Sequence, residues 1–118
     1  MAIEGQKLAI ACARAAEQMQ AEDIRVIDIG GVSSLTDFMV ICSGTSLPHL
    51  KAVMRDVEKE IIEKYQVHAV NAEGDAVSRW VVLDYIDVMV HIMHNELREL
   101  YSLEDLWAEG KEVQWQEE

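Results

Sequence analysis

The sequence has few of the features that form disulfide bonds, metal sites or membrane segments. Its 118 residues include one proline and two cysteines, Cys12 and Cys42, which lie far apart in different apolar patterns. That spacing is typical of neither a zinc site nor a disulfide framework, so we interpret both as buried free thiols in a reducing compartment. No apolar run approaches the ~20 residues of a membrane span, and the first residues do not resemble a secretory signal. We therefore expect a cytoplasmic protein with no membrane partner.

Cations are also scarce, because 10 lysines and arginines face 22 aspartates and glutamates, for a net charge of -12. An acidic surface repels phosphate, which argues against direct sequence-specific binding to nucleic acid. Two interpretations of the charge remain, namely general solubility and docking on a basic partner. Residues 96–118 hold eight acids against Arg98 and Lys111. This asymmetry favours a basic protein partner.

The apolar pattern predicts a single α/β domain with a mixed β-sheet of about five strands flanked by helices. Half of the residues are hydrophobic, which is enough for a core without staples. Spacings of three and four residues predict helices near 6–22, 46–65, 95–101 and 102–107. Alternation or short apolar runs predict strands near 24–29, 38–42, 67–72, 79–84 and 87–94. We assign the domain to residues 1–107 and expect the acidic tail, residues 108–118, to be loosely ordered.

No constellation of side chains predicts an enzyme, a cofactor site or a metal site. The turn at residues 44–46 precedes a helix, but it lacks the lysine and the glycine spacing of a phosphate-binding loop. His91 and His94 are three apart on a predicted strand, so they point to opposite faces and cannot share a metal. We expect His91 to make a single hydrogen bond near the sheet edge. Asp84 and Asp87 bracket a turn, as aspartates often do.

Three motifs resemble the ribosomal silencing factor family, also called the Iojap-related family. They are LTDFMVICSGTS at residues 35–46, RWVVLDYIDVMVH at 79–91 and RELYSLEDLW at 98–107. The resemblance runs from about Leu8 to Trp107, and three motifs in order are far more specific than one. The family usually has glycine at position 86, where this chain has Ile86. A β-branched residue resists a positive φ, so we expect the turn between the last two strands to differ in shape.

The resemblance implies a non-enzymatic repressor of translation with a fold distantly similar to nucleotidyltransferases. Family members bind a basic protein on the joining face of the large ribosomal subunit and obstruct the small subunit, and some form homodimers. Trp80 is our first candidate for the contact, because aromatic anchors dominate interfaces and it lies in the longest motif. The full set of candidate partner-binding residues is Trp80, Leu83, Asp84, Tyr85, Asp87 and Met89.

Two other functions remain open from the sequence. One is a nucleotidyltransferase-like enzyme that uses the Ser43-Gly44 turn, which predicts binding of a nucleotide and a divalent metal. The other is a domain whose only partner is a second copy of itself.

Overall fold

The computed structural model describes residues 3–31, 36–74, 79–101 and 110–116, with only the backbone described at 99–101. The elements are α1 (Gly5–Gln18), β1 (Glu22–Asp28), β2 (Phe38–Gly44), α2 (Leu47–Tyr65), β3 (Asn71–Glu73), β4 (Trp80–Asp84), β5 (Val88–His94), α3 (Asn95–Tyr101) and β6 (Lys111–Val113). The first eight follow the predicted order. The helix predicted at 102–107 lies outside the described residues.

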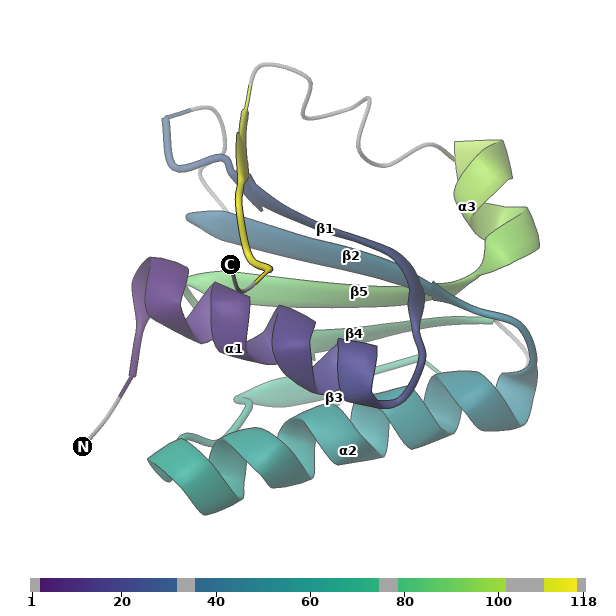
Figure 1. The fold of residues 1–118 in the computed structure, drawn as a ribbon, viewed down its shortest axis with the longest axis horizontal. Helices are drawn as coiled ribbons and strands as arrows, with labels where there is room; N and C mark the ends of the chain where they lie inside the picture. Colours follow the sequence, from purple (N-terminus) through teal and green to yellow (C-terminus); the bar gives the residue numbers. More distant parts are fainter. Residues whose placement is uncertain (1–2, 32–35, 75–78, 102–109, 117–118) are drawn as a thin grey trace.

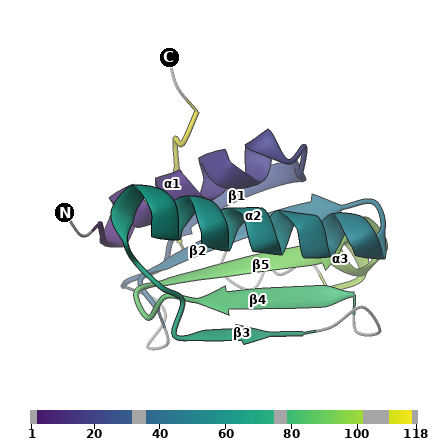
Figure 2. The ribbon, with the colours of Figure 1, turned by 90° about the horizontal axis from the view of Figure 1, so that it is seen from below.

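The strands form one mixed sheet in the order β3-β4-β5-β2-β1-β6. The pair β2–β5 is parallel and the other four pairs are antiparallel. The parallel pair arises because the chain crosses through α2 between β2 and the second half of the sheet, as strand-helix-strand connections require. α1 and α2 lie together against one face of the sheet, and α3 lies beyond the other face (Figures 1 and 2). The predicted mixed α/β architecture is confirmed.

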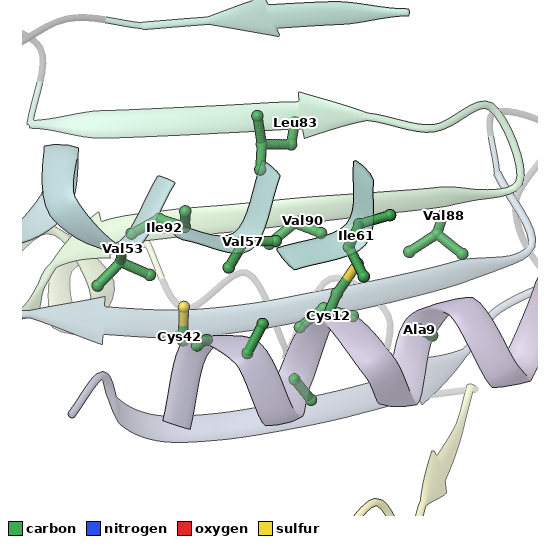
Figure 3. Packing of buried hydrophobic residues seen from close by; sticks show 14 of the residues in the cluster. Ala9, Cys12, Cys42, Val53, Val57, Ile61, Leu83, Val88, Val90 and Ile92 are labelled. Atoms are coloured by element: carbon green, nitrogen blue, oxygen red, sulfur yellow. The ribbon is translucent and has the colours of Figure 1, made fainter. Parts of the chain in front are cut away.

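The core lies between the sheet and the two long helices. α1 contributes small buried side chains, which let the helix approach the strands closely, and α2 contributes a stripe at helical spacing. Ser46 caps α2 by accepting the His49 N–H at 3.2 Å, as the sequence predicts. Figure 3 shows the layer, in which the labelled residues are Ala9, Cys12, Cys42, Val53, Val57, Ile61, Leu83, Val88, Val90 and Ile92.

The C-terminal segment is part of the sheet, which corrects the expectation of a loosely ordered tail. β6 pairs antiparallel with β1, with Val113 opposite Val26, and so makes a sixth strand. Trp115 is only 6 % exposed, and its indole N–H donates to the carbonyl of Ile24 at 3.2 Å. Burying this one large apolar side chain and pairing the edge of β1 outweigh the solvation of the polar residues around it. The domain therefore extends beyond residue 107.

The turn between β4 and β5 is tight, and Ile86 occupies its left-handed position with φ of 78°. Asp84 Oδ1 accepts the Ile86 N–H at 2.8 Å, and the Asp87 N–H donates to the Tyr85 carbonyl at 3.0 Å. The turn thus places a β-branched residue at a positive φ, a conformation that glycine adopts more readily. The Ile86 side chain is 67 % exposed, so little packing offsets the strain.

We predict that Ile86→Gly raises the free energy of unfolding by about 1 kcal/mol. Removing the strain of a β-branched residue at a positive φ stabilises the folded state by ~1–3 kcal/mol. The greater conformational freedom of glycine in the unfolded chain offsets ~0.5–1 kcal/mol of that gain. Urea unfolding at pH 7.5 measures the change. Ile86→Val keeps the branched side chain and should show no gain. Equal stability of the glycine and valine variants would contradict the strain.

Candidate functional site

The pleat of β4 and β5 sorts the candidate residues onto two faces. On β4, Val81 and Leu83 belong to the core under the helices, so Trp80, Val82 and Asp84 point the other way. The register sets Trp80 opposite Met93, Val82 opposite His91 and Asp84 opposite Met89. Directly opposed residues share a face. We call the resulting group of partly buried side chains the open-face patch: Trp80, Val82, Asp84, Met89 and His91.

The edge strand β3 adds an acidic border to the open-face patch. Asn71 pairs with Asp84 and Glu73 pairs with Val82, so both side chains lie on the face of the patch. Both are exposed, and the Asn71 amide donates to Glu73 Oε1 at 2.7 Å. The apolar and aromatic middle of the patch is therefore bordered by the carboxylates of Glu73 and Asp84.

Trp80 lies at the α3 end of the open-face patch. It is partly buried and packs against the buried pair Ile41 and Met93, as Leu97 does. Its indole N–H donates to Nδ1 of His91 at 3.2 Å, and the two ring centroids are 5.9 Å apart with the planes tilted by 50°. His91 makes the kind of hydrogen bond that was predicted, but it does so from β5, a strand with neighbours on both sides, and not near the sheet edge as expected. The indole is held in place but is not part of the core under the helices.

Leu83 and Tyr85 are corrections to the predicted set of contact residues. They are 0 % and 5 % exposed, and both pack in the core between the sheet and the helices. The Tyr85 hydroxyl is buried without a hydrogen-bond partner among the described residues, and burial raises the pKa of this phenol. Neither side chain offers a surface to a partner, because the pleat directs them opposite to Trp80.

Asp87 is committed to the fold. Its Oδ2 accepts the Gly5 N–H at 2.6 Å, at the first residue of α1, where a carboxylate also interacts favourably with the helix dipole. Asp84, in contrast, caps the turn with one carboxylate oxygen while its side chain lies on the patch beside Met89. Of the six predicted contact residues, the structure groups three: Trp80, Asp84 and Met89.

The Ser43-Gly44 turn has its polar groups engaged within the chain. Ser43 Oγ accepts from the guanidinium of Arg98 at 3.1 Å, and Arg98 is itself only 5 % exposed. The Thr45 N–H donates to His49 Nδ1 at 3.1 Å, and His49 in turn is capped by Ser46. These contacts cap the N-terminus of α2 and connect the turn to α3. They do not form a phosphate-binding site.

Other site chemistry is not seen in the described part of the chain. Among residues 3–31, 36–74, 79–101 and 110–116, no group of three or more His, Cys, Asp or Glu side chains is placed to hold a metal ion. Within the same ranges no helix combines the length and apolar character needed to cross a membrane.

Comparison with known families and structures gives concordant matches. The family model described as "Ribosomal silencing factor during starvation" matches residues 2–118. The chain belongs to this ribosomal silencing factor family. The ribosomal silencing factor of Bacillus subtilis is 36 % identical over 98 residues, which are 83 % of this chain and 82 % of that protein. The ribosomal silencing factor of Halalkalibacterium halodurans is 30 % identical over 112 residues, which are 95 % of each chain.

A solved structure supports the same assignment of fold. A crystal structure of a Chromobacterium violaceum protein superposes with a TM-score of 0.84 at 31 % identity, covering 90 % of this chain and 88 % of that one. This chain therefore shares its fold, a mixed sheet of six strands among the described residues flanked by helices, with that protein.

Val82 and His91 were missing from the candidate set drawn from the sequence of this silencing-factor family member. Both lie on the face of Trp80, one opposite the other in the β4–β5 register. The signal that finds them is strand alternation: counting by two from Trp80 reaches Val82 and Asp84, and it passes over Leu83. The longest family motif mixes both faces of the hairpin, which is why it alone could not separate core from surface.

We predict that His91 makes the fold sensitive to mild acid. Burial lowers its pKa from 6.5 to about 4, so the unfolded chain binds more protons between these values and stability falls as pH falls. Linkage gives a loss of about 1 kcal/mol in the free energy of unfolding between pH 7.5 and 5.5. Urea unfolding at both pH values tests this. His91→Phe should lose correspondingly less on acidification, and an unchanged slope in that variant would contradict the prediction.

Proposed function

We propose that this chain represses translation by docking its open-face patch on a basic protein of the large ribosomal subunit, which excludes the small subunit without catalysis. The observation that carries the proposal is the open-face patch itself. A tryptophan, a valine and a methionine gather on a sheet face that α1 and α2 do not cover, between two carboxylates. We propose the cytoplasm as the compartment, where the large subunit is available.

The composition of the patch suits a protein partner. Tryptophan is one of the residue types enriched among the anchors that dominate interface energies. Met89 supplies an adaptable apolar surface, and Glu73 and Asp84 supply the charge that would steer a basic partner toward it. The net charge of -12 acts in the same direction at longer range.

Occupancy alone would suffice for repression. The described chain has a radius of gyration of 12.9 Å and extends 34 × 33 × 30 Å. A body of that thickness on the joining face would hold the two subunits apart, because their contacts require direct apposition. No bond needs to be made or broken.

The enzyme alternative is disfavoured by a specific contact. A nucleotidyltransferase-like use of the Ser43-Gly44 turn would need Ser43 and its neighbours to be available, yet Arg98 and His49 engage them. A thermal shift with nucleotide and Mg²⁺ would revive that alternative, since binding to the folded state must stabilise it. Formation of a homodimer is compatible with docking and forms a separate question.

We predict that Trp80→Ala weakens binding to purified large subunits by more than about 2 kcal/mol, the scale of an interface hot spot. The chain should remain folded, because Trp80 lies outside the main core between the sheet and helices. Binding is measured by co-sedimentation with large subunits over a concentration series.

Trp115→Ala is the matched control for the loss of a large aromatic side chain. Trp115 lies in the main core on the other face, so this change should cost ~3–5 kcal/mol of stability and leave the affinity per folded molecule unchanged. If Trp80→Ala instead behaves like Trp115→Ala, losing stability but not affinity, the docking surface has been placed on the wrong face.

We predict that the block of subunit joining is stoichiometric and reversible, as steric exclusion requires. Light scattering follows the joining of the two subunits while this protein is titrated. Inhibition should saturate near one chain per large subunit, and added small subunits should shift the dose curve by competition. Trp80→Ala should be needed at much higher concentration. A block by substoichiometric protein, or one that persists after its removal, would argue for a catalytic action.

A further inference from the structure

His91 sits in the middle of the open-face patch with one ring nitrogen already used. It lies opposite Val82 on β4 and opposite Ile41 on β2. Its Nδ1 accepts the indole N–H of Trp80 at 3.2 Å, so the ring proton must reside on Nε2. Burial lowers the pKa of His91 to about 4, so the ring is neutral and able to accept this bond at pH 7.

The hydrogen bond completes a frame around the Trp80 indole. Trp80 packs against the buried Ile41 and Met93 of the sheet, and Leu97 of α3 packs against the same two residues. Apolar contacts are non-directional, so they favour a position of the ring more than one rotation of it. The bond to Nδ1, with the planes tilted by 50°, is directional and selects one orientation.

We propose that His91 is a positioning residue for docking: its imidazole fixes the Trp80 indole in the one orientation that the partner binds. This inference rests on the proposed function of the open-face patch. A side chain ordered before binding does not lose its rotational freedom on binding, and affinity rises accordingly. The expected contribution of this ordering is about five- to tenfold in the dissociation constant, which is within the typical cost of immobilising one side chain on binding.

If His91 acts only by orienting Trp80, its contribution to binding depends on Trp80, whereas a direct contact of His91 with the partner would not. The effect of changing His91 should vanish when Trp80 is absent, because there is no indole left to orient. A double-mutant cycle measures this dependence. His91→Phe keeps a ring of similar size and removes the acceptor. His91→Asn keeps an acceptor close to the position of Nδ1 and removes much of the ring.

The first experiment measures dissociation constants for purified large subunits at pH 7.5. His91→Phe should weaken binding about five- to tenfold in the unmutated background and less than twofold in the Trp80→Ala background. His91→Asn should recover most of the affinity. His94→Phe is the matched control, because His94 is on the same strand but its Nδ1 accepts the Glu96 N–H, and it should change nothing. Equal losses in both backgrounds would overturn the positioning role.

The second experiment observes the indole directly, without a partner. Nuclear magnetic resonance of protein labelled with ¹⁵N-tryptophan follows exchange of the Trp80 Nε1 proton with water. Exchange should be markedly faster in His91→Phe than in the unmutated chain and intermediate or slow in His91→Asn. Unchanged exchange would overturn the positioning role of His91 and would leave the proposed function unaffected. Failure of the unmutated chain to bind large subunits would overturn the proposed function and, with it, this inference, whatever the exchange rates show.

Discussion

The carboxylate of Asp87 accepts the backbone N–H of Gly5 at 2.6 Å and so joins the β4–β5 turn to the start of α1. The carbonyl oxygen of the same residue accepts the N–H groups of Asp37 and Phe38 at 3.2 and 3.0 Å, where β2 begins. One residue therefore connects the first helix, the central strand and the hairpin that carries the patch. With α1 fixed in this way against one face, the open-face patch lies on the other face of β4 and β5, where we propose that the partner docks.

The pleat then separates the core residues of the β4–β5 hairpin from those of the proposed docking surface. Val81 and Leu83 face the helices and are 2 % and 0 % exposed, whereas Trp80 and Asp84 face away from them. Arg98 donates to Ser43 and so fastens α3 to the sheet, and Leu97 of α3 packs against the same buried pair, Ile41 and Met93, as Trp80 does. Substitutions on the two faces should consequently have different effects, because one set fills a packed core and the other shapes a surface.

Much of the fold could be predicted from local pattern, because helices and central strands have strong periodicities. β6 could not, since two of its three residues are charged and exposed, and only Val113 and, just beyond the strand, Trp115 are apolar residues that pack on the core. The site was half predictable. The family motif located the hairpin and Trp80, but it also contains Leu83 and Tyr85, whose burial follows from strand alternation. The internal role of Asp87 depends on Gly5, a contact across 82 positions that no local pattern contains.

The pairing of β6 with β1 has a consequence for synthesis on the ribosome. β1 emerges well before residues 111–113, and one of its edges lacks its neighbour until they follow. The nascent chain therefore carries an open strand edge in the meantime, and such edges are prone to pair with other chains. The bond from Gly5 to Asp87 is likewise delayed. Vectorial synthesis leaves this domain without its final strand until residues 111–113 have emerged.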